Sequence, residues 1–159
     1  MAVLNNAQLT ISAARDQQAK EIVSLWRQSF QRAMGLAEQN AAAEFAHQLA
    51  FYRTIPLAHI SVSHWGSDNV VAGFLVCSDA VVEHLYVRVE QQGKGVGKSL
   101  LDYAKRANPL GLKLRTFEMN TGAQQFYLSQ GFVEVGRGIA SLADNPWASS
   151  TCLLYTSDA

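Results

Sequence analysis

Apolar residues alternate with polar ones in some stretches of the chain and recur every three to four positions in others. The alternation over residues 9–13 predicts a short strand. Helical spacing follows over residues 22–33, with Asp16 as the predicted N-cap and Gly35 as the predicted end. A second helix is predicted over residues 38–53, where apolar side chains again share one face.

Glycine and turn residues divide the rest of the chain into further strands and helices. Strands rich in β-branched and aromatic residues are predicted over 60–65, 70–77, 81–89 and 112–119, and another begins at Phe132. One helix follows a glycine-rich loop and runs to residue 107, and another covers 121–130 and ends at Gly131. This order predicts a single α/β domain of the α+β type, with a mixed, mainly antiparallel sheet flanked by helices.

Composition and charge narrow the classes of protein to consider. The 159 residues are 48% hydrophobic and 16% charged, which is typical of one globular domain. Thirteen basic residues balance thirteen acidic ones, so neither nucleic acid nor a membrane surface is an expected partner. The sequence has neither a secretory signal nor a long apolar run, so we expect a cytoplasmic protein. Both a monomer and a homodimer are open as its oligomeric state. The two cysteines lack metal-ligand spacing, and we expect no metal site.

Residues 92–99 form a glycine-rich segment between a predicted strand and a predicted helix. Three glycines in five residues allow sharp turns and a close approach of the backbone to a ligand. The helix start adds unpaired N–H groups and a positive dipole end, and Lys94 and Lys98 add positive charge. We therefore predict a binding site for a phosphate or pyrophosphate group.

Three nucleotide-binding motifs can be compared with this segment. The ATP/GTP P-loop requires a glycine where Gln92 stands, and a start at Gly93 leaves the loop one residue short. The dinucleotide pattern G-x-G-x-x-G requires a glycine where Lys98 stands. The pattern Q/R-x-x-G-x-G/A fits at Gln92, Gly95 and Gly97. The segment thus resembles the pyrophosphate loop of the GCN5-related N-acetyltransferases, the GNAT family.

The resemblance to this family extends to two further segments. Residues 83–87 are similar to the family's central strand, which splays from its neighbour and admits the pantetheine arm of coenzyme A. The pattern N-x-x-A-x-x-F-Y-x-x-x-G-F is matched by Asn120, Ala123, Phe126, Tyr127, Gly131 and Phe132. The resemblance implies a GNAT-like fold and an enzyme that transfers an acetyl group from acetyl-CoA to a primary amine of a small molecule, peptide or protein.

The resemblance also implies the residues of the site. Backbone N–H groups near Tyr86 and Val87 would bind the thioester oxygen, and Tyr127 would protonate the leaving sulfur. The alternative role of Tyr127 is packing, and Asn120 is equally open to interpretation as a helix cap. The residues implied to contact acetyl-CoA are Leu85, Tyr86, Val87, Gln92, Gly93, Lys94, Gly95, Val96, Gly97, Lys98, Asn120, Ala123, Phe126 and Tyr127.

Glu83 is the candidate general base. Strand alternation places it on the same face as Leu85 and Val87, so we expect a semi-buried carboxylate that accepts the proton of the amine through a water. A salt-bridged strand carboxylate is the alternative, and the residues leave both open. His84 points to the opposite face, and its unperturbed pKa would suit a general base, but we expect a structural, hydrogen-bonded histidine there.

The acceptor amine is not identified by any motif. Aromatic residues with a candidate role in an acceptor pocket also have the spacing of core residues: Trp26, Phe30, Phe45, Tyr52 and Trp147. A small amine, an amino acid and a protein N-terminus all remain open as acceptors. Two other functions are also kept open, namely a non-catalytic CoA-binding module and a small P-loop nucleotide binder.

Residues 152–159 read Cys-Leu-Leu-Tyr-Thr-Ser-Asp-Ala. This octapeptide matches an in-frame translation of the transposase end sequence used to prepare DNA sequencing libraries. We therefore expect an acetyltransferase domain over residues 1–151 and a non-native tail over 152–159. The alternative is a genuine last strand, because Leu153, Leu154 and Tyr155 have strand propensity.

Overall fold

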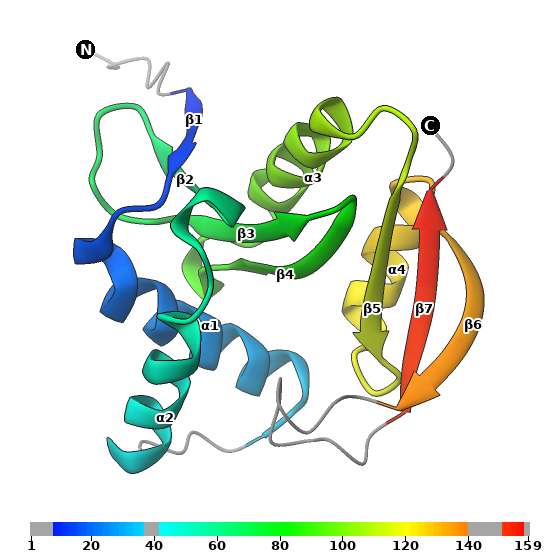
Figure 1. The fold of residues 1–159 in the computed structure, drawn as a ribbon, viewed down its shortest axis with the longest axis horizontal. Coiled ribbons are helices and arrows are strands. Elements are labelled where there is room, and N and C mark those ends of the chain that lie inside the picture. Colours follow the sequence, from blue (N-terminus) through cyan, green and yellow to red (C-terminus); the bar gives the residue numbers. More distant parts are fainter. Residues whose placement is uncertain (1–7, 37–41, 140–150, 158–159) are drawn as a thin grey trace.

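A computed structural model describes residues 8–36, 42–139 and 151–157. The strands form one seven-stranded sheet in the order β1-β2-β3-β4-β5-β7-β6 (Figure 1). Every neighbouring pair is antiparallel except β4 and β5, which run parallel. The strands are β1 Leu9–Ala13, β2 Ile60–Trp65, β3 Gly73–Ser78, β4 Val81–Val87, β5 Leu112–Phe117, β6 Val133–Ile139 and β7 Thr151–Ser157.

Helices cover both faces of this sheet. The α-helices are α1 Ala19–Ala33, α2 Ala42–Tyr52, α3 Val96–Ala107 and α4 Thr121–Ser129, and the short 3₁₀ turns are η1 Asp16–Gln18, η2 Leu57–His59 and η3 Val89–Gln91. The predicted fold class and order of elements are confirmed. Within the described part of the chain, no helix is both long enough and apolar enough to span a membrane.

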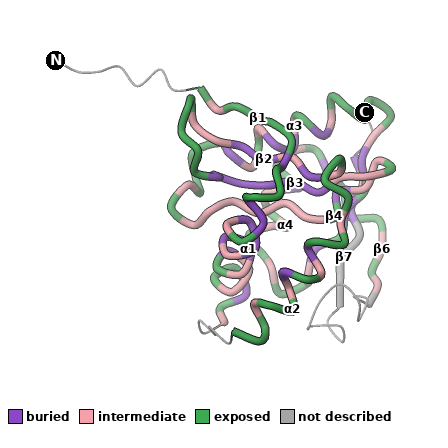
Figure 2. The backbone as a smooth tube through the Cα atoms, turned by 60° about the vertical axis from the view of Figure 1, so that its left-hand side comes forward, coloured by how far each residue is buried: buried purple, intermediate pink, exposed green. Residues whose placement is uncertain are grey.

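Two hydrophobic cores lie on opposite faces of the central strands. Helices α1 and α2 pack on one face, where Trp26 and Phe74 are buried. Helices α3 and α4 pack on the other face, around Leu75, Leu100 and Phe132. Successive residues of β3 thus enter different cores, and Figure 2 shows most of this strand as buried. A central strand buried on both faces explains its nearly continuous apolar sequence.

Several predicted boundaries are wrong by a few residues. Asp16 does not cap α1 but begins the 3₁₀ turn η1. The strand predicted from Val70 begins at Gly73, and the strand predicted to Val89 ends at Val87. Residues 37–41, at the predicted start of the second helix, lie outside the described residues.

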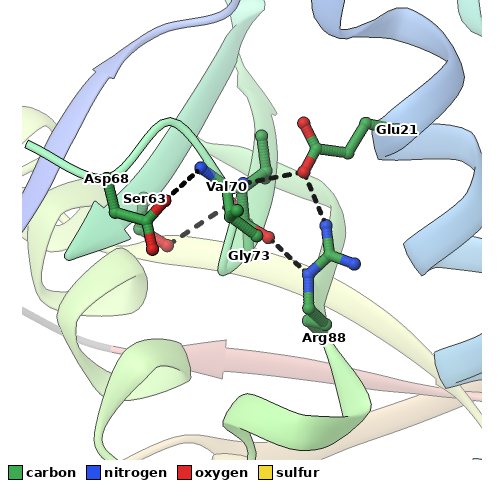
Figure 3. Close-up of polar contacts among 7 residues, drawn as sticks. Glu21, Ser63, Asp68, Val70, Gly73 and Arg88 are labelled. Carbon is green, nitrogen blue, oxygen red and sulfur yellow. Dashed lines mark hydrogen bonds and ion pairs between the residues drawn. The ribbon is translucent and has the colours of Figure 1, made fainter.

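The late start of β3 has a visible cause. The Val71 N–H donates to Glu21 Oε2 at 2.9 Å, and the Val71 carbonyl accepts from Arg88 Nε at 2.8 Å (Figure 3). Around them, Asp68 Oδ1 accepts from the Val70 N–H at 2.9 Å. Side chains therefore satisfy backbone groups that a regular strand pairing would otherwise bind.

Residues 151–157 complete the sheet as β7, between β5 and β6. Tyr155 and Ser157 are buried, and Ser157 Oγ accepts a hydrogen bond from the Leu112 N–H at 3.1 Å. Apolar residues of high strand propensity pair in this way whatever their origin. The non-native origin of residues 152–159 stays a prediction.

Candidate active site

Strands β4 and β5 separate soon after they meet. They pair only at Val81 with Lys113 and at Val82 with Leu114, whereas the pairing of β4 with β3 continues to Val87. Figure 1 shows the two strands diverging. Beyond Val82, the backbone edge of β4 that faces β5 pairs with none of the described strands. Such an edge offers N–H and C=O groups to an extended ligand.

A bulge interrupts β4 at Glu83. His84 pairs with Val76 and Val82 pairs with Cys77, so Glu83 has no partner residue in β3. Its side chain is exposed, and its carboxylate accepts a hydrogen bond from Ser78 Oγ at 3.1 Å. The expectation of a semi-buried Glu83 is wrong, because its side chain is exposed at a bulge, where regular strand alternation is broken.

His84 lies on the α1 face of β4, opposite Leu85 and Val87, as predicted. Its ring centroid is 4.6 Å from that of Trp26 in α1. Burial, and then the positive charge of Arg115, lower the pKa of His84 to about 4. Among the described residues no hydrogen bond to the imidazole is found, so the expected hydrogen-bonded histidine is not what the structure shows.

The glycine-rich segment turns between β4 and α3. Gly93 and Gly95 have φ angles of 77° and 84°, the left-handed region that favours glycine. A Cβ added at either position would meet no other atom within 4 Å, so the outer side of the loop is open. None of the backbone N–H groups from Gly93 to Lys98 donates to another described group, and Ser99 makes the first helical bond, to Gly95. Free amides at a helix N-terminus are what an anion requires.

Side chains fix this loop and modify its charge. Gln92 Nε2 donates to the Val87 carbonyl at 3.2 Å and to Ser29 Oγ of α1 at 3.4 Å. Lys98 Nζ forms an ion pair with Asp102 at 2.7 Å, so its charge is partly balanced. Lys94 is exposed and has no partner within the described ranges, which leaves its charge available to a phosphate.

Helix α4 brings the second motif against the loop. Asn120 Oδ1 accepts from the Ala123 N–H at 3.1 Å, so the interpretation of Asn120 as a helix cap is confirmed. Ala123 and Phe126 pack on the α3 core. A Cβ added at Gly97 would lie 3.4 Å from Phe126 Cζ and 3.5 Å from Val87 Cγ2. Gly97 thus lets α3, α4 and the end of β4 approach one another, with the buried Val96 beside it.

Tyr127 of α4 lies in the core on the α3 side of the sheet. Its ring is buried, with centroids 5.6 Å from Phe132 and 6.5 Å from Tyr155. Burial, and then the nearby Tyr86, hold the pKa of Tyr127 well above its usual value. Burial also raises the pKa of Tyr86 to about 12. Both hydroxyls therefore stay protonated and able to donate a hydrogen bond.

The structure places Phe126 of α4 against Gly97 of the loop and Tyr86 near Tyr127, whereas Asn120 is seen only as the cap of α4 and Glu83 is exposed. Two features were missed from the sequence. Ser29 is one of them, and a polar residue within the apolar face of a predicted helix was the sequence feature that could have indicated its role. The Glu21–Arg88 ion pair gave no local signal at all.

The aromatic residues considered for an acceptor pocket divide into two groups. Trp26 and Tyr52 are buried in the core that α1 and α2 form on one face of the sheet. Phe30 and Phe45 pack against that core and are partly exposed. Trp147 lies outside the described residues. In the described part of the chain, no three His, Cys, Asp or Glu side chains gather as metal ligands would.

Comparisons with known proteins agree with this geometry. The model of the acetyltransferase (GNAT) domain matches residues 59–134. The peptidyl-lysine N-acetyltransferase YjaB of Salmonella typhimurium is 26% identical over 129 residues, which is 81% of this chain and 86% of that protein. The solution structure of apo-form YjaB from Escherichia coli has a TM-score of 0.75 at 22% identity, covering 94% of this chain and 97% of that one.

The structure of yncA from Salmonella typhimurium with acetyl-CoA has a TM-score of 0.63 at 20% identity, covering 96% of this chain and 94% of that one. The matched segment runs from the end of η2 into β6 and so contains the splayed strand, the glycine loop and the α4 motif. Residues 59–134 thus match the acetyltransferase (GNAT) domain, and the chain as a whole has the fold of these acetyltransferase structures.

Proposed function

We propose that the protein transfers the acetyl group of acetyl-CoA to the side-chain amine of a lysine in a peptide or protein. The observation that carries the proposal is the row of free amides from Gly93 to Lys98, next to the end of β4 and to Phe126 of α4. The lysine acceptor is supported by the similarity to a peptidyl-lysine N-acetyltransferase. The P-loop alternative is set aside, because residues 59–134, which include the glycine loop, match the acetyltransferase (GNAT) domain.

In this proposal the amides of Gly93, Gly95, Gly97 and Lys98 hold the pyrophosphate, with the helix dipole of α3 behind them. The exposed ammonium of Lys94 adds attraction. The pantetheine arm extends along the free edge of β4, where its amides replace the missing strand partner. Leu85 and Val87 are the half-buried residues of that edge.

Contacts from the loop and α4 complete the proposed acetyl-CoA site. Gln92 fixes the loop through its bond to the Val87 carbonyl, and Val96 contributes its backbone N–H. The side-chain amide N–H₂ of Asn120 is left to contact the arm, since its oxygen caps α4. Ala123 and Phe126 supply apolar contact.

The proposed reaction is a direct attack, in which a C–N bond forms and the C–S bond of the thioester breaks. The backbone N–H of Val87, on the free edge of β4, stabilises the charge that develops on the carbonyl oxygen, whereas the N–H of Tyr86 faces β3 in the observed register. The phenol of Tyr127 protonates the leaving thiolate. Glu83 accepts the proton of the amine through water and passes it to solvent, a role that its exposure permits.

A second candidate is CoA binding without catalysis. Two observations favour it: Glu83 points outward, and the ring of Tyr127 is packed in a core. In either case we propose a cytoplasmic protein, monomeric or homodimeric, that does not bind nucleic acid or a membrane. The balance of thirteen basic and thirteen acidic residues supports that proposal.

The test is release of free CoA thiol from acetyl-CoA with a panel of acceptors. The panel contains a lysine peptide with an acetylated N-terminus, the same peptide with arginine in place of lysine, a peptide with a free N-terminus and a small diamine. We expect turnover with the lysine peptide and a mass increase of one acetyl group on its lysine. Acetyl-CoA binding without turnover of any acceptor would establish the non-catalytic candidate instead.

A further inference from the structure

His84 occupies a particular place on β4. It is the first residue beyond the bulge at Glu83, and the last paired residue between β4 and β5, Val82, lies two positions before it. Its side chain therefore stands where the two strands begin to separate. Tyr86 follows two positions later on the same face of β4, with its ring 6.0 Å from Trp26.

Aromatic rings hold the imidazole in one orientation. The ring centroid of Trp26 lies 4.6 Å from that of His84. The ring of Phe51 in α2 lies edge-on to the imidazole, with 6.3 Å between their centroids. Such contacts require no hydrogen bond, and within the described ranges none is found. An enclosed polar ring in this state is unusual, because buried polar groups are normally bonded.

The ring nitrogens of His84 are nevertheless not sealed from solvent. Among the described residues, the fully buried side-chain atoms without a partner are the Tyr52 hydroxyl and Thr116 Oγ1. The His84 side chain is partly exposed, although protein surrounds most of its ring. An imidazole that packs among aromatic side chains and is still partly exposed can accept a hydrogen bond from a bound group.

Charge around the ring defines what it binds. The imidazole carries no charge at neutral pH, since burial and the cation of Arg115 on β5 both disfavour its protonation. One ring nitrogen is then a hydrogen-bond acceptor. The same cation disfavours an ammonium group nearby and so favours an amine in its neutral, nucleophilic form.

We propose that His84 binds the attacking amine, accepting a hydrogen bond from its N–H and so directing its lone pair toward the thioester. This inference rests on the proposed acetyl transfer to lysine. The aliphatic stem of the lysine would lie against the aromatic side chains on the α1 side of β4, Trp26 and Phe51. Tyr127 belongs to the core on the other face of the sheet. In this proposal the residues that contact the amine and the leaving sulfur therefore lie on different faces of the sheet.

The test compares two variants of one position. His84→Phe keeps an aromatic ring among aromatic neighbours but removes the acceptor, whereas His84→Gln keeps an acceptor. We expect His84→Phe to raise KM for the lysine peptide on the order of tenfold, the loss of one hydrogen bond, while the Kd of acetyl-CoA stays within about twofold. His84→Gln should recover a large part of that loss. His64→Phe, a histidine of β2 bonded to Ser12 and Gly66, is the matched control and should leave both constants unchanged.

A second measurement separates this inference from the proposed function. The ring ¹⁵N signals of His84 are recorded while the lysine peptide is added to the CoA-saturated protein, which needs no turnover. The inference is supported if these signals shift with the lysine peptide and do not shift with the arginine peptide. This result would hold even if no acceptor is acetylated. A well-folded His84→Phe protein with wild-type KM, or His84 signals that do not move, would overturn it. Absence of turnover in the wild type, by contrast, counts only against the proposed function.

Discussion

The guanidinium of Arg88 donates to the carboxylate of Glu21 at 2.7 Å, although 67 residues separate them in the sequence. The same carboxylate oxygen accepts the Val71 N–H, and Arg88 Nε donates to the Val71 carbonyl (Figure 3). Two side chains thus join the start of α1, the approach to β3 and the exit from β4. Because Arg88 precedes η3 and the glycine loop, this network also fixes the base of the proposed pyrophosphate site.

Glu21→Ala is therefore expected to destabilise the fold. It leaves the half-buried Arg88 without its ion pair and the Val71 N–H without an acceptor, which we expect to cost about 2–3 kcal/mol. Urea unfolding measures this loss. Glu44→Ala is the control, since its exposed contact with Arg27 is longer, 3.4 Å, and should change stability by less than about 1 kcal/mol. Equal losses in the two variants would contradict the role of the network.

Local patterns in the sequence were sufficient for the order of elements and for the glycine loop. A turn built on glycine and the helix start that follows it depend on neighbouring residues only. The sharp turn predicted at Gly93 and Gly95 is therefore found, with left-handed φ angles at both glycines. The cap of α4 is equally local, because Asn120 binds an amide three positions later. These are the features that also carry the family resemblance.

Features that depend on pairing between distant segments were not predictable in the same way. The bulge at Glu83 arises from the register of β4 on β3, and it leaves exposed a residue that simple alternation would half bury. The late start of β3 depends on Glu21 and Arg88, which no periodicity links to Val71. The local pattern of His84 suggested a hydrogen-bonded residue, whereas the structure surrounds it with aromatic rings.

Gly95→Val is expected to remove acetyl-CoA binding. The φ angle of 84° is strained for any β-branched residue, and the side chain would enter the open space on the outer side of the loop, where we propose that a phosphate oxygen binds. Calorimetry should show at least a tenfold loss of affinity, on the order of 1.4 kcal/mol or more. Gly138→Ala is the control, because a Cβ there also meets no atom within 4 Å and no positive φ is involved. Unchanged affinity of a folded Gly95→Val protein would exclude the loop as the site.

Tyr127→Phe is expected to lower kcat much more than it weakens acetyl-CoA binding. The variant keeps the buried ring and its contact with Phe132 but loses the phenol that we propose as general acid. A lost general acid typically costs about 10²- to 10⁴-fold in rate. Steady-state kinetics at saturating acceptor measure the effect, with the exposed Tyr103→Phe as control. Wild-type turnover by Tyr127→Phe would reduce Tyr127 to a packing residue.

The low pKa of His84 makes a prediction about stability that does not depend on activity. Unfolding releases the imidazole to its ordinary pKa of 6.5, whereas burial and Arg115 hold it at about 4 in the folded protein. Between these values the unfolded chain binds more protons, so the contribution of His84 is full above pH 6.5 and is lost as the pH falls toward 4. The difference between the two pKa values corresponds to at most about 3.4 kcal/mol, at 1.36 kcal/mol for each pKa unit. Other carboxylates also titrate in this range, and therefore the quantity to measure is the difference in unfolding free energy between the wild type and His84→Phe. Between pH 7 and pH 4.5 the wild type should lose more unfolding free energy than His84→Phe does. A difference that stays constant with pH would show that His84 has the same pKa in the folded and unfolded protein.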